Sequence, residues 1–314
     1  MPWSLSPDLG ILVVAVVLEM VGREPPKWFH PTVWIGRSVT IAEAKAPTSR
    51  NTGFIFGVMI LLLVAGIWGA AAYFAAEGLR DIHQIAYILV GGCILKTTFS
   101  VKMLHHAATK VRDLLVSGDT DGFRAHMSWL VSRDASNMTP EQAAAATVES
   151  VSENIADSII GPWLAFALFG LPGAVAYRAI NTLDSMIGYH GRYEYLGKAS
   201  AKFDDLVNLI PSRLAGFLLV LASLVLPGQK ASSAWRTMWR DHGKTESPNA
   251  GWTMSGMAGA LGVELEKTDH YRLGDSTREV EPEDITRTVR SMYFVAGTGL
   301  LAALGITYLR SWIW

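Results

Sequence analysis

The sequence predicts an all-α, polytopic integral membrane protein with broken or re-entrant helices and a cytoplasmic helical extension. Half of its 314 residues are hydrophobic, they are gathered in long blocks, and the mean hydropathy is +0.25, all of which is typical of membrane proteins. Polar side chains recur at helical spacing beside these blocks, and prolines and glycines interrupt two of them. The net charge of −1 gives no basic field of the kind that nucleic-acid-binding domains carry.

The N-terminal region combines an apolar run with a proline-rich loop. Leu9–Leu18 is short for a complete span, so we expect a partial crossing or a hydrophobic anchor. The run lacks the flanks of a signal peptide, so we expect residues 1 to 21 to belong to the mature protein. In the loop GREPPKWFHPTVWIGR the prolines argue against a regular helix, and Trp28, Phe29 and Trp34 suit a membrane interface.

Three further apolar runs are expected to be transmembrane helices. Phe54–Ala76 has 23 residues without a charge, enough at ~1.5 Å per residue to cross a hydrocarbon core of ~30 Å. Ile82–Phe99 is the second, joined to the first by a tight hairpin at Glu77–Asp81. Met292–Leu309 is the last, and it runs into an aromatic end that suits the interface.

Two other apolar runs contain helix breakers. Only about ten residues separate Pro162 from Pro172 within Ile159–Ala176, too few for a span. A broken or re-entrant element fits better, and such backbone is tolerated only where it is buried in protein or lines a cavity. Leu206–Leu226 has the length of a span but begins with polar and helix-breaking residues.

The remaining segments read as more polar helices. Lys102–Leu115 has the pattern of an amphipathic helix. Thr139 as N-cap and Pro140 at the first helical position start a helix that continues through alanines into Glu149–Asp157. Glu281–Asp284 places acidic residues in the first turn of the final helix.

Lysine and arginine counts give a partial topology. The loop 22–52 carries five basic residues and the following hairpin one, so we expect 22–52 and 100–157 to be cytoplasmic and the N-terminus to be outside. Charge counting does not decide whether the two interrupted runs cross fully. We expect one membrane domain over 1–314, with a cytoplasmic helical segment at 100–150 and a cytoplasmic extension at 227–290.

Three clusters of polar residues follow one another in the middle of the chain. Each has members one helical turn apart, so each lies along one helix face. Ionisable groups beside lipid are costly and by default mark a functional site. A single cluster of this kind more often stabilises a contact between helices or lies on a solvated helix face. Three clusters in succession favour a functional site. The clusters are Glu149, Glu153 and Asp157; Arg178, Asn181 and Asp184; and Asp204, Asp205 and Asn208.

The segment 227–290 carries the motif ESPNAGWTMSGMAGALG. Ser247-Pro248-Asn249 is typical of a turn, and the glycines that follow indicate close helix packing more than a ligand-binding loop. The sequence has no GxxxxGK[ST], HExxH, CxxC or GxSxG pattern, so the standard nucleotide and metal motifs are missing. Cys93 is the single cysteine, and its apolar surroundings indicate a packing role.

The segments ESVSENIADSIIGPWLAFALFGLPGAVAYRAINTLDSMIGY, KFDDLVNLIPSRL and SPNAGW resemble the CobD/CbiB family of cobalamin biosynthesis. The loop GREPPKWFHPTVWIGR is similar to the opening Gly-Asp-Pro, His-Pro and Ile-Gly pattern of that family, so the resemblance covers about residues 10 to 275. Glu19 and Glu24 stand where the family usually has Asp. Thr245-Glu246 precedes Ser-Pro-Asn where a His is common, and Trp252-Thr253 replaces a frequent Trp-Pro.

The resemblance implies a membrane-bound adenosylcobinamide-phosphate synthase. Members of the family join adenosylcobyric acid to aminopropanol or its phosphate through an amide bond, with ATP. Such a reaction would need Mg²⁺, with carboxylates on the metal and basic groups on the phosphates. The implied partners are these substrates, the lipid bilayer and later cobalamin-assembly enzymes. Because ATP is cytoplasmic, we expect a multi-pass cell-membrane protein whose active site faces the cytoplasm.

The resemblance and the polar clusters together name the candidate site residues, although spacing does not say which carboxylate does which job. For catalysis we expect Glu153, Asn154, Asp157, Arg178, Asn181 and Asp184. As Mg²⁺ ligands we expect members of the set Glu149, Glu153, Asp157, Asp184, Asp204 and Asp205. For substrate and phosphate binding we expect His30, Lys198, Lys202, Asn208, Arg213, Ser247 and Asn249. A structural His in a His-Pro turn is an equal alternative for His30.

Two other classes of function fit the same pattern. Broken helices with charges at membrane depth are also found in small-molecule transporters, although no inverted repeat is visible. A membrane scaffold for later assembly enzymes is the third reading, and it requires no chemistry of the carboxylates.

Overall fold

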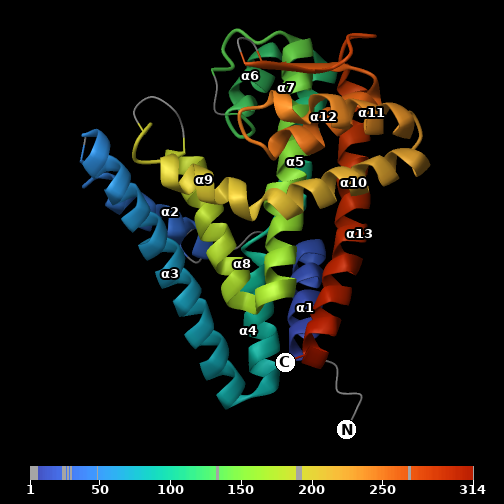
Figure 1. Ribbon diagram of the computed structural model, residues 1–314. Coiled ribbons are helices and arrows are strands. Elements are labelled where there is room, and N and C mark those ends of the chain that lie inside the picture. Colours follow the sequence, from blue (N-terminus) through green and yellow to red (C-terminus); the bar gives the residue numbers. More distant parts are fainter. Residues whose placement is uncertain are drawn as a thin grey trace. The chain divides into compact units, whose positions relative to one another are not determined.

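The computed structural model describes residues 6–22, 26, 28, 30–47, 49–131, 134–188, 193–267 and 270–313, and these are mostly helical (Figure 1). Internal contacts divide the chain into two compact units. Unit 1 comprises 1–100, 161–207 and 300–314, and unit 2 comprises 101–160 and 208–299. Each unit is thus assembled from segments that are far apart in the sequence.

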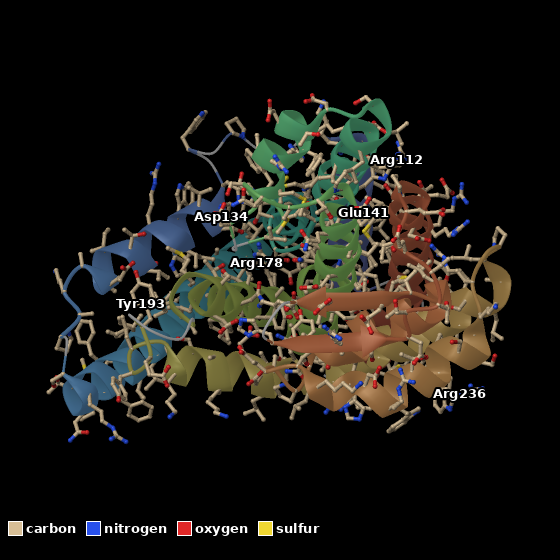
Figure 2. All side chains as sticks on the ribbon, turned by 90° about the horizontal axis from the view of Figure 1, so that it is seen from above. Arg112, Asp134, Glu141, Arg178, Tyr193 and Arg236 are labelled. Carbon is tan, nitrogen blue, oxygen red and sulfur yellow. The ribbon has the colours of Figure 1, made fainter. Side chains whose placement is uncertain are left out.

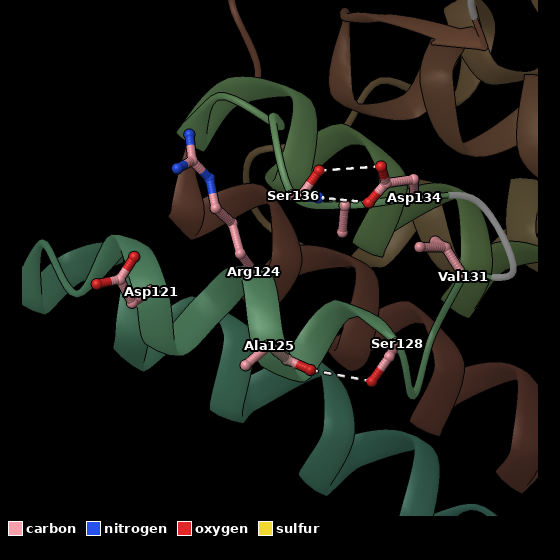
Figure 3. A pocket seen from close by; sticks show the side chains of 8 residues that line it. Asp121, Arg124, Ala125, Ser128, Val131, Asp134 and Ser136 are labelled. Carbon is pink, nitrogen blue, oxygen red and sulfur yellow. Dashed lines mark hydrogen bonds between the residues drawn. The ribbon is translucent and has the colours of Figure 1, made fainter.

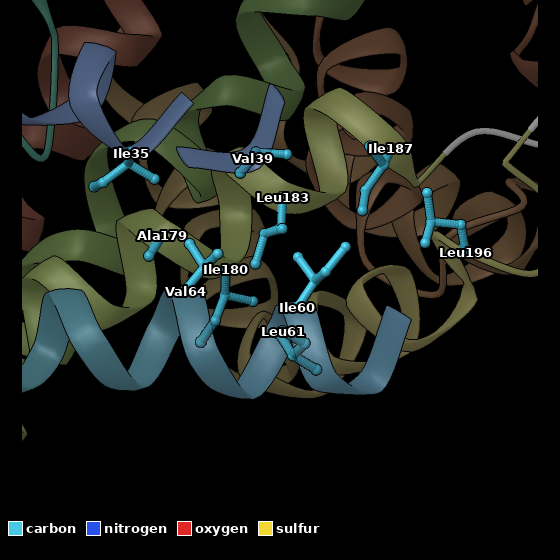
Figure 4. Packing of buried hydrophobic residues seen from close by; sticks show 10 residues of the cluster. All are labelled: Ile35, Val39, Ile60, Leu61, Val64, Ala179, Ile180, Leu183, Ile187 and Leu196. Carbon is cyan, nitrogen blue, oxygen red and sulfur yellow. The ribbon is translucent and has the colours of Figure 1, made fainter. Parts of the chain in front are cut away.

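Unit 1 is a group of helices around an aliphatic core. Figure 4 shows α2, α3 and α8 meeting around side chains such as Val39, Val64 and Leu183. Tyr193 follows α8 and donates a hydrogen bond of 2.5 Å to Glu43 at the end of α2 (Figure 2). The helices of unit 1 are α1 (Pro7–Val21), α2 (Pro31–Glu43), α3 (Arg50–Ile82), α4 (Gln84–Lys96), α8 (Gly161–Ile187), α9 (Lys198–Val207) and the end of α13 (Pro282–Ile313).

The described elements of unit 2 are helices apart from one small hairpin. In it β1 (Glu264–Lys267) pairs antiparallel with β2 (Tyr271–Gly274), and Leu265 lies opposite Leu273. The residues of α12 are buried along the whole helix. A Cβ on Gly251 would lie 2.1 Å from the carbonyl oxygen of His242, so this position needs glycine for α12 to approach η3. The elements of unit 2 are α5 (Lys102–Ser117), α6 (Thr120–Met127), α7 (Pro140–Ile155), the π-helix η2 (Ala156–Ile160), α10 (Leu209–Val225), α11 (Ala231–Asp241), η3 (His242–Lys244), α12 (Ala250–Leu261), β1 (Glu264–Lys267), β2 (Tyr271–Gly274) and the start of α13.

The protein is an all-α polytopic membrane protein with broken helices, as the sequence predicts. Three helices among the described residues are long and apolar enough to cross a membrane: α3, the run Pro140–Ile187 and α13. The pair α9 and α10 is bent by 50° and would make a fourth span if taken together. The N-cap Thr139 and the acidic first turn of α13 are also as expected.

The predicted break in the run 159–176 lies at Gly170, with Pro172 two residues later. Gly170 has φ +69°, a left-handed conformation that favours glycine. One turn earlier, the carbonyl oxygen of Phe166 accepts a 2.8 Å hydrogen bond from Arg310. Gly161-Pro162 does not break the helix, but it directly follows η2. A proline removes one helical hydrogen bond, and a π turn is one way for the backbone to adjust.

The second predicted span is shorter than expected. α4 contains 13 residues, or ~20 Å at ~1.5 Å per residue, which is less than the ~30 Å of a hydrocarbon core. The hairpin at Glu77–Asp81 is also wrong, because α3 continues to Ile82 and the turn is at His83. Arg80 donates a 2.7 Å hydrogen bond to Glu77 one turn away, an interaction that stabilises a last helical turn.

The proline-rich loop is partly helical, contrary to the sequence-based expectation. α2 begins at Pro31, where a missing N–H costs nothing because the first helical N–H has no partner in the helix. Trp28 is exposed and its carbonyl accepts a 3.0 Å hydrogen bond from the indole of Trp34. Phe29 lies outside the described residues. The β1–β2 hairpin is a further element that the sequence patterns did not predict.

Two buried ionic contacts hold the apolar helices of unit 1 together. Lys96 and Glu19 form a 2.8 Å ion pair with side chains only 5% and 7% exposed. Asp8 receives a hydrogen bond from the guanidinium of Arg310 and another, of 2.5 Å, from Tyr87. Charges at such depth are stable only when paired, so these contacts constrain how the helices can pack.

We predict that Arg310→Met destabilises the protein by about 3 kcal/mol, because Asp8 would keep its buried charge while losing its closest cation. The change also removes the donor to Phe166. Chemical unfolding in detergent, followed by helical circular dichroism, measures the loss. The matched control is Arg290→Met on the same helix, where Arg290 lies 3.9 Å from Glu283 and both side chains are about half exposed. An Arg310 effect no larger than that of the control would contradict the prediction.

Candidate functional site

The candidate residues of unit 1 lie on α8 and α9. Arg178, Asn181 and Asp184 follow one face of α8 at intervals of three residues, and Arg178 donates a 3.2 Å hydrogen bond to the side-chain oxygen of Asn181. Figure 2 labels Arg178 among the side chains of this unit. A guanidinium whose orientation is set by a neighbouring amide can still present its other N–H groups to an anion.

Asp184 of α8 and Asp205 of α9 form a pair of neighbouring carboxylates. The two helices pack together, and the charges of the two side chains interact. Asp184 is half-buried, and a Cβ on Gly188 would lie 2.1 Å from its Oδ1 oxygen. Glycine at 188 therefore leaves room for this carboxylate at the end of α8. Two like charges at short range repel each other, which a bound cation or a proton relieves.

The other candidates of unit 1 have less defined surroundings. Lys198 and Lys202 are exposed on the same side of α9, whereas Asp204 is buried. His30 is the N-cap residue of α2 and is half-buried, but its side chain does not cap the helix. Phosphate binding by the two lysines and proton transfer by His30 stay predictions.

In unit 2 the first candidate cluster lies on α7 and η2. Glu149 is largely buried and accepts a 2.7 Å hydrogen bond from the hydroxyl of Tyr271 in β2. Asn154 donates to the carbonyl oxygen of Ser150 at 2.9 Å and accepts from Ser158 at 2.8 Å.

The π-helix η2 changes the geometry of this cluster. Glu153 lies two residues before the end of α7, and Asp157 lies in η2. Both side chains are half-buried. A π turn contains more residues than an α turn, so Asp157 points in a different direction from the one that a regular helix would give. Single π turns inside helices are frequent at functional sites.

A second cluster of unit 2 joins two motifs that lie far apart in the sequence. Arg213 of α10 donates a 3.2 Å hydrogen bond to the side-chain oxygen of Asn249, which also accepts from Ser212 at 3.1 Å. Ser247 accepts a 3.2 Å hydrogen bond from the backbone N–H of Asn249. Asn208, at the break between α9 and α10, is buried and its carbonyl accepts from Ser212. The segments KFDDLVNLIPSRL and SPNAGW thus meet at these side chains.

Aromatic rings surround Arg213. Its guanidinium lies 4.9 Å from the ring of Trp252, and His242 stacks on that ring with centroids 4.2 Å apart. Burial and the nearby charge of Arg213 lower the pKa of His242 below its ordinary value, so the imidazole is neutral at pH 7. Arg213 therefore supplies the positive charge of this cluster.

The six predicted Mg²⁺ ligands are divided between the units. Glu149, Glu153 and Asp157 belong to unit 2, and the three aspartates Asp184, Asp204 and Asp205 belong to unit 1. Within the part of the chain that the structure describes, no three His, Cys, Asp or Glu side chains lie close enough to hold a metal ion. The magnesium site stays a prediction.

An open hollow of about 870 Å³ lies elsewhere in unit 2, along α6 and the segment after it (Figure 3). Hydrogen bonds from the backbone and hydroxyl of Ser136 lower the pKa of Asp134 at its rim. None of the predicted site residues lines this hollow, and Asp134 and Ser136 at its rim bond to each other. The polar clusters are therefore better candidates for the site. The lining residues are Asp121, Arg124, Ala125, Ser128, Val131, Asp134, Ala135 and Ser136.

Sequence reasoning missed several residues that contact the candidates. Tyr271, the partner of Glu149, lies in a short strand without any motif. His242 and Trp252 flank Arg213, and the only signal was that Trp252 closes the SPNAGW motif. Lys96 is a charge within the apolar run Ile82–Phe99, but no sequence pattern indicates Glu19 as its partner.

Comparisons with known proteins agree on one family. The family model described as CobD/Cbib protein matches residues 12–292. The cobalamin biosynthesis protein CobD of Dehalococcoides mccartyi is 40% identical over 301 residues, which cover 96% of this chain and 97% of the relative. The cobalamin biosynthesis protein CbiB of Salmonella typhimurium is 38% identical over 307 residues, 93% of this chain and 94% of the relative. No solved structure matches the chain. With a family match over most of its length and relatives matched almost end to end, the chain belongs to the CobD/CbiB family.

Proposed function

We propose that this protein acts in cobalamin biosynthesis as an adenosylcobinamide-phosphate synthase. It would join adenosylcobyric acid to aminopropanol or its O-phosphate through an amide bond, using ATP. The observation that carries the proposal is the near full-length match to relatives named cobalamin biosynthesis proteins. Acid and amide side chains held half-buried in an apolar helical protein support it, because such groups are costly without a function.

The reaction requires the carboxylate of the acid to be activated. A carboxylate oxygen attacks the γ-phosphorus of ATP, ADP leaves, and an acyl phosphate forms. The neutral amine then attacks the acyl carbon, phosphate leaves with the electron pair of the broken bond, and the nitrogen loses a proton. Because phosphoryl transfer depends mostly on positioning and charge neutralisation, the protein must supply acids for a metal and cations for phosphate.

The acids on α8 and α9 fit a magnesium ion by their chemistry. Mg²⁺ prefers oxygen ligands and is usually held by one or two carboxylates together with substrate phosphates. Asp184 and Asp205 offer such a pair, since their like charges already interact. When bound, Mg²⁺ would neutralise charge on the triphosphate. Asp204 is buried and sits a residue away, where it would help to position α9.

Basic and amide groups would hold the substrates. Arg178 can present a planar fork to a phosphate or carboxylate while Asn181 fixes its direction. Arg213 and Asn249 can do the same in unit 2, with Ser247 and Asn208 holding the turn around them. Glu153, Asn154 and Asp157 are assigned to orienting the reacting groups, and Glu149 to positioning through Tyr271. The active site is proposed to face the cytoplasm, where ATP is available.

A transporter is the second candidate, and the broken helix favours it. Discontinuous helices with polar groups at the break form the substrate sites of many secondary transporters, and α8 is broken at Gly170. Sealed vesicles that accumulate a corrinoid without any ATP-dependent product would favour transport over synthesis.

We predict that Asp184→Asn and Glu153→Gln each lower ATP-dependent amide formation by about 100-fold or more, the scale of removing one preorganised charged group from an active site. Product formation is measured by mass spectrometry with protein in nanodiscs, with free and phosphorylated aminopropanol in parallel. Asp113→Asn is the control, since Asp113 is exposed on α5 and, among the described residues, forms an ion pair with Arg112 alone. Full activity of both site variants in folded protein would refute the assignment.

We also predict that a cysteine at position 185 reacts with an impermeant maleimide from the cytoplasmic side of sealed vesicles. Ser185 is exposed one residue after Asp184, so it reports the side on which that carboxylate lies. The experiment uses a Cys93→Ser background, because Cys93 is the single native cysteine and is exposed. Labelling from the outside only would show that the proposed orientation is wrong.

A further inference from the structure

Unit 2 contains a continuous row of aromatic rings beside Arg213. We call it the aromatic shelf and define it as Trp235, Trp239, His242 and Trp252. Trp235 meets Trp239 with centroids 5.6 Å apart, and Trp239 meets Trp252 at 5.1 Å, both edge to face. His242 stacks on Trp252 at 4.2 Å. The rings come from α11, η3 and α12, whose close packing around Gly251 fixes their positions.

The outer half of the shelf is exposed. The side chains of Trp235 and Trp239 are 45% and 52% exposed, whereas Trp252 is only 7% exposed. An exposed apolar patch marks an interaction or ligand-binding site, and aromatic rings such as these can stack on another ring.

Arg213 lies next to the shelf with its charge uncompensated by any described carboxylate. Its hydrogen-bond acceptors are the carbonyl of Leu209 and the side chains of Ser212 and Asn249, all of them neutral. Other arginines of unit 2 behave differently: Arg240 pairs with Asp241, and Arg278 with Asp284. A half-buried cation with neutral partners is suited to receive an anion.

The indole N–H of Trp252 is a second, independent observation that points to a ligand-binding site. This nitrogen is buried and has no hydrogen-bond partner among the described residues. A buried donor without an acceptor costs about 1–3 kcal/mol unless something else satisfies it. The ring that carries it is in contact with both Arg213 and Trp239.

We propose that Arg213 and the aromatic shelf bind a purine nucleotide, with the base against Trp239 and the phosphates at Arg213. Both groups contact the ring of Trp252, at 5.1 and 4.9 Å, so they are separated by a distance that a nucleoside triphosphate bridges. Proteins that bind single-stranded nucleic acids combine the same two contacts, a base stacked on an aromatic ring and a positive charge at the phosphates. This inference rests on the proposed use of ATP and names where its base would lie.

Contact of the same tryptophans with lipid is the competing explanation. Unit 2 already has an apolar exposed stripe on α10, formed by Ile210, Phe217 and Leu224. The exposed side of α11 differs, because it also carries Arg236, which projects at the edge of the unit in Figure 2. A lipid anchor requires neither the unpaired cation nor the buried indole donor, so the observations favour a nucleotide.

The test is equilibrium dialysis of labelled ATP against the full-length protein in nanodiscs, with no corrinoid present. Tripolyphosphate, which has no base, is measured as a competitor. Trp239→Ala should weaken ATP binding about tenfold, the scale of losing one stacked base, and leave competition by tripolyphosphate unchanged. Trp239→Phe should restore most of the affinity, and Arg213→Gln should weaken both ligands. Trp129→Ala should change neither, because Trp129 is a more exposed tryptophan of unit 2 that has no ring contact with any described residue.

Unchanged ATP affinity in Trp239→Ala would overturn the proposal, and so would equal losses for ATP and tripolyphosphate. An effect confined to retention of the protein in the membrane would assign the tryptophans to lipid and also overturn it. Amide synthesis by the wild type, measured in parallel, separates this inference from the proposed function. Synthesis without any Trp239 effect on ATP rejects only the shelf, and shelf-dependent ATP binding without synthesis rejects only the reaction.

Discussion

The cost of a charge in apolar surroundings is the constraint on which this structure depends. Unit 1 contains aliphatic helices that could slide past one another with little change in hydrophobic contact. Two buried ionic contacts, between Glu19 and Lys96 and between Asp8 and Arg310, prevent this, because any shift would leave a charge unpaired. The same cost explains why the remaining polar side chains gather in clusters on α7, α8, α9 and α10. They are retained at a cost to stability, which is why they are the candidates for the functional site.

Much of the fold could be predicted from the sequence because its signals are local. The uninterrupted apolar run in α3, the Thr139–Pro140 start of α7 and the break at Gly170 each follow from the chemistry of a few adjacent residues. The boundaries were harder. Glu77–Asp81 could form either a turn or a last helical turn, and the exposed ion pair between Glu77 and Arg80 favours the helix only weakly.

For the candidate site, the sequence names residues but says less about how they are arranged. Helical spacing placed Arg178 and Asn181 together, and they do form a hydrogen bond. The contact between Arg213 and Asn249 could not be read from spacing, since it depends on how α10 packs against α12. For Asp157, regular helical spacing predicted a side-chain direction that the π turn changes. Tyr271 and His242 carry no local signal, and only their three-dimensional neighbours give them a role.

The pairing of Asp8 with Arg310 links residues that are 302 positions apart. Because translation runs from the N-terminus, Asp8 is synthesised 302 residues before Arg310. During synthesis the carboxylate of Asp8 is therefore present before its closest counter-ion, with Tyr87 and Arg80 as its earlier partners. A variant that lacks the helical turn around Arg310 would leave the buried charge of Asp8 without its closest cation, so this turn is a poor place for a deletion.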